Sequence, residues 1–217
     1  MTGFQSARQM MVDCQVRPSD VTRYALIDAM LRIPREQFVP RAKRDVAYAE
    51  IEVEVSDGRA LLSPRIFAKM VEAAGVREGD LVLELCPATG YSTAVLAAVA
   101  EMVVAIEPDE TLAQQAQSSL DRLSINNAVV TSGDPVEGDE AHAPFDLVFV
   151  NGAVEMVPAS LSAQLKDGGR MVALVSDGST CSCRTFTRTG DAISERFMFD
   201  GYGPLLNGFS REAEFSL

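Results

Sequence analysis

From Leu81 onward, short runs of β-branched and apolar residues alternate with segments of helical periodicity. This alternation is typical of strand–helix repeats and therefore of a parallel sheet covered by helices. Five strands are expected, over residues 81–85, 103–106, 128–131, 145–150 and 171–175. Helices are expected between them, over residues 92–100, 109–123 and 158–165. The fold class is α/β, with a Rossmann-like and mostly parallel sheet.

The chain changes character after Val175, where no further strand–helix unit follows. Residues 183–188 and 192–199 flank Thr189-Gly190-Asp191, a pattern that predicts an antiparallel hairpin. A parallel sheet finished by such a hairpin resembles the class I methyltransferase fold more than that of a dinucleotide dehydrogenase.

The first 75 residues are expected to form a helical segment. Helices are predicted over residues 4–14 and 19–31, with Ser19 or Asp20 as the cap of the second. Pro34 and Pro40 bracket a turn or a short helix. Residues 50–58 indicate an extended connection, and residues 64–74 a helix that has Pro64 in its first turn and Gly75 just past its end.

A single domain over residues 1–217 follows from the length of the chain and its 47% hydrophobic content. It divides into the helical segment 1–75, a Rossmann-like core 76–200 and an irregular tail 201–217. The tail is expected to wrap over the sheet edge or the substrate cleft, anchored by Phe209 and Phe215.

The charge and hydropathy of the chain exclude several classes of partner. A net charge of -12 disfavours binding to nucleic acid or to an anionic membrane, because both depend on clustered Lys and Arg. No apolar run has the length of a membrane span, and the first residues lack the apolar core of a signal peptide. We therefore expect a cytoplasmic protein, and the residues indicate no particular oligomeric state.

Metal binding is also disfavoured. Cys14, Cys86, Cys181 and Cys183 have no zinc-ligand spacing, and His142 is the single histidine. Isolated thiols of this kind usually act as small hydrophobic residues, and we predict no metal site.

The first strand exit is the expected ligand site, because doubly wound sheets bind ligands beyond the carboxyl ends of their strands. It reads ELCPATGY, from Glu84 to Tyr91, and opens directly into a helix whose N-terminal N–H groups can face polar ligand atoms. Gly90 allows the sharp turn. The candidate cofactor contacts in this loop are Glu84, Cys86, Ala88, Thr89 and Gly90.

Three further polar residues follow the next strands. Glu107, followed by Pro108, can accept both hydroxyls of a ribose, Asp134 can meet an adenine amino group, and Asn151 lies near the reacting end of a ligand. Each has a structural alternative, in which Glu107 caps a helix, Asp134 forms an Asx turn and Asn151 caps a loop. Their regular placement at consecutive strand exits favours a nucleoside site.

The chain resembles the protein-L-isoaspartate O-methyltransferase family through Val175. The motifs that are specific to this family lie in the N-terminal part of the chain. They are MVDCQVR (11–17), AMLRIPREQFVP (29–40), Ala47-Tyr48 and SPRIFAKM (63–70). Later matches are GYSTAVLA (90–97), Gly133-Asp134, APFDLVFV (143–150) and LKDGGRMV (165–172). The resemblance implies S-adenosylmethionine as cofactor, and a peptide or protein bearing isoaspartate as substrate, whose side-chain carboxylate is methylated in an early step of protein repair.

The chain departs from the family pattern at the expected catalytic loop, which ordinarily reads Thr-Ile-Ser-x-Pro. Aligned on Pro64, the serine position holds Leu62, which has no hydrogen-bonding group. A one-residue shift would give the role to Ser63. Arg59, where the family has glutamine, can bind an anionic substrate through its guanidinium or be an exposed loop arginine. Ser63 and Arg59 are the catalytic candidates.

The second departure lies in the cofactor loop, where Cys86, Ala88 and Gly90 replace three alternating glycines. Cys86 and Ala88 add a Cβ atom and Pro87 removes a donor, so we expect weaker cofactor binding or a different loop shape. Cys86 can be a reactive thiol near a helix N-terminus, but a small apolar filler is the simpler interpretation.

Three functional hypotheses follow: an active isoaspartyl methyltransferase, a methyltransferase acting on another substrate, and a non-catalytic binding module. A nicotinamide-dependent oxidoreductase is disfavoured because CPATGY lacks the G-x-G-x-x-G turn.

Overall fold

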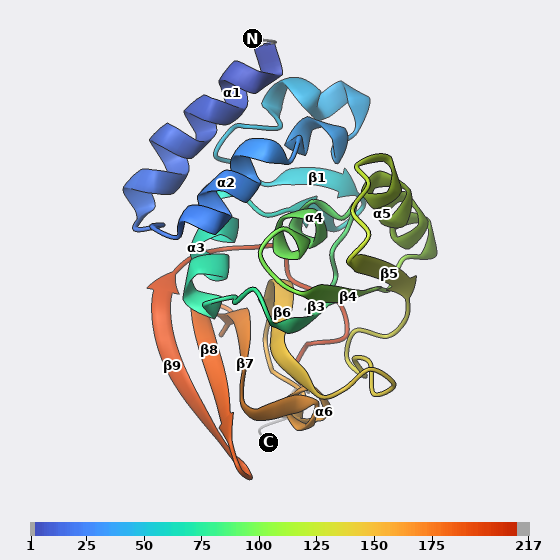
Figure 1. Cartoon of the computed structure of the whole chain (residues 1–217). Helices are drawn as coiled ribbons and strands as arrows, with labels where there is room; N and C mark the ends of the chain where they lie inside the picture. Colours follow the sequence, from blue (N-terminus) through green and yellow to red (C-terminus); the bar gives the residue numbers. More distant parts are fainter. Residues whose placement is uncertain (1–2, 212–217) are drawn as a thin grey trace, which may run out of the picture.

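The computed structural model describes residues 3–211, and its centre is a seven-stranded sheet (Figure 1). The strand order is β5-β4-β3-β6-β7-β8-β9. The strands are β3 (Leu81–Leu85), β4 (Met102–Glu107), β5 (Ala128–Ser132), β6 (Phe145–Val154), β7 (Leu165–Ser176), β8 (Cys181–Thr189) and β9 (Ala192–Asp200). The strands β3 to β7 pair in parallel and β8 and β9 antiparallel, which confirms the expected α/β sheet and its final hairpin.

The order of the strands reverses at β3. The chain runs outward from β3 to β4 and β5 on one side, then returns to place β6 and β7 on the other. Leu85, the last residue of β3, is in register with Ile106 of β4 and Val150 of β6. Glu107 and Asn151, the residues that follow these two partners, therefore flank the exit of β3.

Helices precede or connect the parallel strands. They are α3 (Pro64–Ala74), α4 (Tyr91–Ala97), α5 (Glu110–Arg122) and α6 (Ala159–Ala163). The helix predicted at residues 64–74 is confirmed, with Gly75 at φ +60 after its end. Asp109 caps α5 by accepting hydrogen bonds from the backbone N–H groups of Thr111 and Leu112. The helix predicted at residues 158–165 is shorter than expected because Leu165 already pairs with Phe145 in the sheet.

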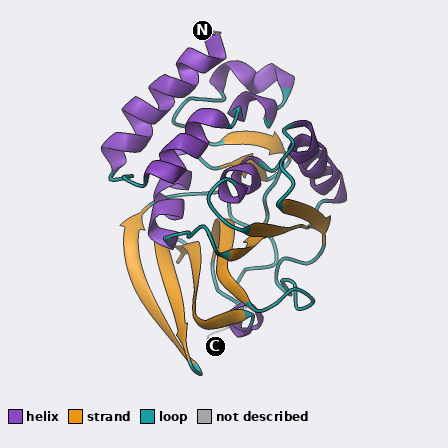
Figure 2. Cartoon of the chain, in the orientation of Figure 1, coloured by secondary structure: helices purple, strands orange, loops and turns teal. Residues whose placement is uncertain are grey.

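The N-terminal segment is helical, as expected, and lies at the end of the molecule opposite the tip of the β8–β9 hairpin (Figure 2). Its helices are α1 (Gly3–Met11), a π-helical turn (Val12–Val16), α2 (Tyr24–Arg32) and 3₁₀ turns at Arg17–Ser19, Arg35–Gln37 and Arg41–Val46. The predicted start of the second helix at residue 19 is wrong. Ser19 donates its hydroxyl to the carbonyl of Gln15, and Asp20, at φ +62, ends the preceding turn, so neither caps α2.

The extended connection predicted at residues 50–58 is in fact part of a β-hairpin. β1 (Val53–Ser56) pairs antiparallel with β2 (Arg59–Leu61), with Val53 opposite Leu61. Gly58, at φ +66, makes the turn after Asp57. The Val-Glu-Val alternation of β1 buries only Val53 deeply, so the acidic residues concealed a short strand in the sequence.

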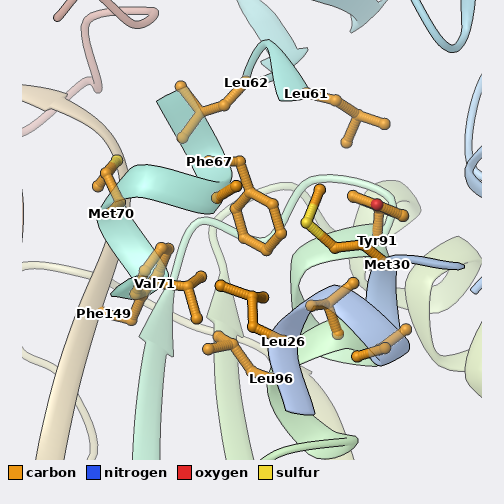
Figure 3. Close-up of a cluster of buried hydrophobic side chains, with 14 of the residues drawn as sticks. Leu26, Met30, Leu61, Leu62, Phe67, Met70, Val71, Tyr91, Leu96 and Phe149 are labelled. Atoms are coloured by element: carbon orange, nitrogen blue, oxygen red, sulfur yellow. The ribbon is translucent and has the colours of Figure 1, made fainter. Parts of the chain in front are cut away.

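The two faces of the sheet pack against separate apolar clusters. In β3, Val82 belongs to the cluster that contains α3 and α4, whereas Leu83 and Leu85 belong to the other. Figure 3 shows the first cluster, where Phe67 contacts both Tyr91 and Phe149 by edge or tilted ring packing. Glu84 alternates with Leu83 and Leu85 along the strand, so its side chain lies on the Val82 face.

The tail packs along β6 rather than continuing the sheet. Ala153 donates its N–H to the carbonyl of Pro204, and Leu206 donates to the carbonyl of Ala153, both at 2.8 Å. Leu206 and Phe209 are buried in the second cluster, so Phe209 is confirmed as an anchor. Phe215, the other predicted anchor, lies outside the described residues.

Within residues 3–211, no helix has the length and apolar character needed to cross a membrane. The same residues contain no cluster of three or more His, Cys, Asp or Glu side chains that could hold a metal ion. All four cysteines are free thiols.

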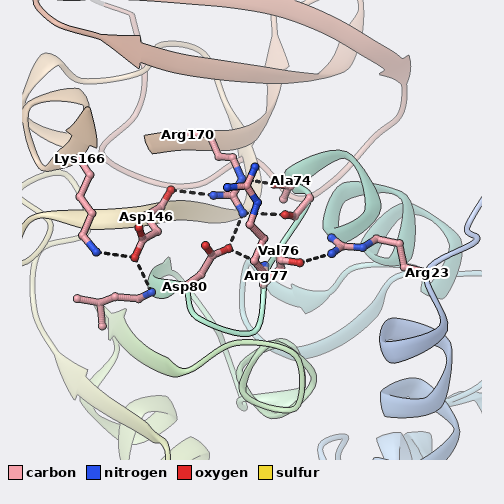
Figure 4. Close-up of polar contacts among 10 residues, drawn as sticks. Arg23, Ala74, Val76, Arg77, Asp80, Asp146, Lys166 and Arg170 are labelled. Carbon is pink, nitrogen blue, oxygen red and sulfur yellow. Dashed lines mark hydrogen bonds and ion pairs between the residues drawn. The ribbon is translucent and has the colours of Figure 1, made fainter. Parts of the chain in front are cut away.

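A partly buried arginine joins β7 to the end of α3 (Figure 4). Arg170 donates to the carbonyls of Ala74 and Gly75 and forms an ion pair with Asp80. Its Nη1 donates to the carbonyl of Asp146 at 3.1 Å. The Asp80 side chain is only 6% exposed, and its Oδ2 also accepts a hydrogen bond from the Arg77 N–H at 2.7 Å.

We expect Arg170→Ala to lower the free energy of unfolding by about 3 to 5 kcal/mol, because it leaves a buried carboxylate without its cation. Urea denaturation measures this loss. Lys166→Ala is the matched control, since its pair with Asp146 is 43% exposed on the lysine side and is worth less than about 1 kcal/mol. Equal losses in the two variants would contradict this account.

Candidate active site

The loop after β3 has a backbone conformation that favours glycine. Cys86, Ala88 and Gly90 have φ values of +63, +55 and +90. Each non-glycine residue in this region costs roughly 1 to 2 kcal/mol. A Cβ atom on Gly90 would also lie 3.0 Å from the Cβ of Ala116 in α5. Two residues that carry a Cβ atom therefore occupy this conformation, and weaker cofactor binding or a different loop shape stays a prediction.

The Cys86 side chain is a buried apolar filler. It is 2% exposed and belongs to the second apolar cluster. Burial raises the pKa of its thiol to about 12, and nearby Arg59 opposes this only in part. The thiol is therefore protonated at neutral pH, which favours the filler over a reactive cysteine.

Glu107 is the most heavily bonded residue at the strand exits. Its side chain is fully buried, and its Oε2 accepts hydrogen bonds from the Ala88 N–H and from Arg59 Nη2, both at 2.7 Å. Its Oε1 accepts from the Asp109 N–H at 3.3 Å. Burial raises the pKa of this carboxyl, and the Arg59 cation opposes the rise. Asp109, rather than Glu107, caps the following helix.

Arg59 reaches the site from β2. Its Nη2 donates to the Cys86 carbonyl at 3.1 Å as well as to Glu107, and its side chain is 14% exposed. The interpretation of an exposed loop arginine is therefore wrong. Arg59 therefore belongs to the same group of side chains as Glu107 and the loop after β3, which we call the strand-exit cluster. Its guanidinium pairs with the carboxylate that is expected to bind ribose.

Buried acceptor atoms lie beside this cluster. Within the described part of the chain, both carboxylate oxygens of Glu84 and the Oδ1 of Asn151 are buried without a hydrogen-bond partner. Asn151 instead uses its Nδ2, which donates to Ser92 Oγ at 2.8 Å. Burial raises the pKa of Glu84 from 4.5 to about 7, opposed by the nearby hydroxyls of Ser92 and Thr93. Such acceptors fit a ligand that brings N–H donors and positive charge.

The other cofactor candidates lie at the margin of the cluster. Thr89 donates its hydroxyl to the Phe38 carbonyl at 2.5 Å, which ties the loop to the N-terminal segment. Asp134 is exposed, and its Oδ1 accepts from the Val136 N–H at 2.8 Å, so the Asx turn weighed for it is present. Pro108 is exposed after β4.

Ser63 is held by a residue that the sequence did not single out. Its hydroxyl donates to Glu50 Oε1 at 2.8 Å, and the Arg65 N–H donates to Glu50 Oε2 at 3.0 Å. The acidic segment 50–58 gave no sign that Glu50 would bind Ser63 and Arg65, because these partners are more than ten residues away in sequence.

Leu62 turns its side chain inward, at 2% exposed. Its carbonyl accepts a hydrogen bond at 2.7 Å from Arg35, which is itself 1% exposed and lies over the Tyr91 ring. Arg35 is a second missed residue, although it stands inside one of the N-terminal blocks that carry the family resemblance. It holds the Leu62 carbonyl and, through its Nε, the Ala47 carbonyl.

Comparison with known proteins decides the family. The family model described as Protein-L-isoaspartate(D-aspartate) O-methyltransferase (PCMT) matches residues 7–199. The chain belongs to this family. The resemblance seen in the sequence is thereby confirmed.

Relatives of the O-methyltransferase family align over most of the chain. It is 40% identical over 172 residues to "Protein-L-isoaspartate O-methyltransferase" of Koribacter versatilis (strain Ellin345), covering 79% of this chain and 78% of that one. A protein of the same name from Roseiflexus sp. (strain RS-1) is 34% identical, and 97% of each chain is covered. The fold is that of a putative family member from Plasmodium falciparum solved with S-adenosyl-L-homocysteine, at TM-score 0.78, 16% identity and coverage of 95% and 99%.

We expect Glu84→Gln to remove a pH dependence of stability from this family member. A carboxyl whose pKa rises from 4.5 to about 7 on folding weakens the fold as pH increases between these values, and the loss is complete above them. At about 1.4 kcal/mol per pKa unit, the penalty at pH 8 is roughly 3 to 4 kcal/mol.

Urea denaturation at pH 5 and pH 8 tests this expectation. Glu84→Gln should gain stability relative to the native protein at pH 8 and little at pH 5. Glu101→Gln changes an exposed carboxyl just before β4 and should follow the native protein at both values. A Glu84→Gln difference that is the same at pH 5 and pH 8 would contradict the buried-carboxyl account.

Proposed function

We propose that this chain is an S-adenosylmethionine-dependent methyltransferase that methylates the side-chain carboxylate of isoaspartyl residues in peptides or damaged proteins, an early step in their repair. Its membership of the family supports the reaction. The observation that assigns the cofactor site to particular residues is the Glu107 carboxylate, which is fully buried at the exit of β4. The oxygens of Glu84 and Asn151 that lack a hydrogen-bond partner lie beside it.

The donor and acceptor groups of the site fit the cofactor. Glu107 is the acceptor for ribose hydroxyls, and the unpartnered oxygens of Glu84 and Asn151 suit an ammonium group. Glu84 also supplies negative charge in a buried setting, where a cation compensates for the cost of desolvating the carboxylate. When bound, S-adenosylmethionine supplies an electrophilic methyl group on a positively charged sulfur.

The substrate end of the reaction requires orientation rather than proton transfer. A carboxyl group with an ordinary pKa near 4 is already ionised at neutral pH, so the chain needs no general base to activate it. Its residues must instead position the carboxylate oxygen and exclude water. We propose Arg59 and Ser63 for this positioning, since the Leu62 side chain has no hydrogen-bonding group at the position aligned with the expected serine.

Methyl transfer to a matched pair of peptides tests the function. One peptide carries isoaspartate and the other aspartate at the same position of one sequence, with methyl-labelled S-adenosylmethionine as donor. We expect label in the isoaspartyl peptide alone. Binding of cofactor without transfer to either peptide would favour another substrate, and absence of cofactor binding would favour a non-catalytic module.

We expect Glu107→Ala to weaken S-adenosylhomocysteine binding by about 1.5 to 3 kcal/mol, the range for losing a hydrogen bond to a charged group. Calorimetric titration measures the change, and circular dichroism checks the fold. Glu101→Ala removes an exposed carboxyl and should bind as the native protein does. Unchanged affinity in folded Glu107→Ala would mean that Glu107 has only a structural role.

We expect Leu62→Ser to raise kcat/KM for the isoaspartyl peptide, because a missing positioning contact can cost ~100-fold in rate. Leu61→Ser is the matched control, since Leu61 is equally buried at 2% and its loss should destabilise without a gain. Both are assayed well below their unfolding temperatures. Rapid native turnover with no improvement in Leu62→Ser would show that another group, such as Ser63, already positions the carboxylate.

A further inference from the structure

The Glu107 carboxylate has little hydrogen-bonding capacity left. An ionised carboxylate offers about four acceptor positions. Three are taken, by the Ala88 N–H, the Asp109 N–H and Arg59 Nη2. About one acceptor position therefore remains, whereas the two hydroxyls of a ribose require two.

Arg59 is the one of these three donors that can leave. The Ala88 and Asp109 N–H groups belong to the backbone of the loop after β3 and the start of α5 and stay in place as long as those elements do. Arg59 reaches Glu107 through a long side chain from the β1–β2 hairpin, which forms a two-stranded sheet of its own. Its side chain is 14% exposed, whereas that of Glu107 is 0% exposed, so the guanidinium covers the carboxylate.

A displaced Arg59 would be a cation in need of an anion. Its Nη2 makes two hydrogen bonds, to the Cys86 carbonyl and to Glu107, and the other three of its five N–H donors bond to no residue within 3–211. A guanidinium that loses its carboxylate in a largely desolvated position carries an uncompensated charge, which favours any carboxylate that can reach it.

We propose that Arg59 couples cofactor binding to substrate binding: the ribose hydroxyls displace its guanidinium from Glu107, and the freed guanidinium then pairs with the carboxylate of the isoaspartyl substrate. This inference rests on the proposed function and deepens it. The coupling depends on the positive charge of the Arg59 side chain, which an uncharged residue at this position would not supply.

Coupling of this kind predicts an order of binding. Before the cofactor binds, the Arg59 charge is neutralised by Glu107, and an anionic peptide finds no free cation. After it binds, the same charge faces the substrate. The effect is reciprocal, because a substrate that favours displaced Arg59 must raise cofactor affinity by the same factor.

The first test is titration of S-adenosylhomocysteine into the native protein, Arg59→Gln and Lys43→Gln. Removing the competing guanidinium should tighten binding by at least about fivefold, the lower range of such couplings. Lys43 lies near the same hairpin and pairs with exposed Glu54, so Lys43→Gln should bind as the native protein does. Titrations are run at pH 8.5, because loss of the Arg59 cation raises the pKa of buried Glu107.

The second test measures peptide binding by fluorescence anisotropy with and without saturating S-adenosylhomocysteine. The native protein should bind a labelled isoaspartyl peptide at least about fivefold more tightly when the nucleoside is present. Arg59→Gln should lose this gain, and Arg59→Lys, which keeps the charge without the planar fork, should retain part of it.

The outcomes separate this inference from the proposed function. If the native protein binds S-adenosylhomocysteine and methylates the isoaspartyl peptide, but Arg59→Gln binds the nucleoside no more tightly or keeps the full peptide gain, the coupling is overturned and the function stands. If neither the native protein nor Arg59→Gln binds the nucleoside, both are overturned.

Discussion

The buried carboxylate of Glu107 connects the segments that form the candidate site. By accepting the Ala88 N–H it holds the loop after β3, by accepting the Asp109 N–H it fixes the start of α5, and by pairing with Arg59 it draws in the β1–β2 hairpin. These segments come together only because β4 lies beside β3 in parallel register. The order of the strands therefore decides which polar side chains can contact one another at this edge of the sheet.

The loop after β3 holds two non-glycine residues in a backbone conformation that favours glycine. Cys86 and Ala88 lie in the left-handed region, so the surrounding contacts compensate for their strain. The Cys86 N–H donates to Ile106 and the Ala88 N–H to Glu107. Strain and buried, unpartnered acceptors such as Glu84 are both unfavourable for stability. Their concentration at one edge of an otherwise well-packed sheet is typical of a functional site.

The sequence predicted the parts of the molecule that depend on local pattern. Strand and helix periodicity placed the sheet. Of the three polar residues expected at consecutive strand exits, Glu107 and Asn151 flank the exit of β3, whereas Asp134 is exposed in an Asx turn. Prediction from the sequence failed where long-range contacts decide. The β1–β2 hairpin was missed because its acidic residues obscure the alternation, and the roles of Glu50 and Arg35 were missed because their partners are distant in sequence. The pairing of Arg59 with Glu107, 48 residues apart, could not be read from either segment alone.

The central claim is that Glu107 exchanges the Arg59 guanidinium for the hydroxyls of a nucleoside. The most direct measurement is a crystal structure of this protein with S-adenosylhomocysteine bound. The account predicts both ribose hydroxyls within hydrogen-bond distance of the Glu107 carboxylate, with the Arg59 guanidinium moved off it. A nucleoside bound elsewhere, or bound here with the Arg59–Glu107 pair intact, would contradict it.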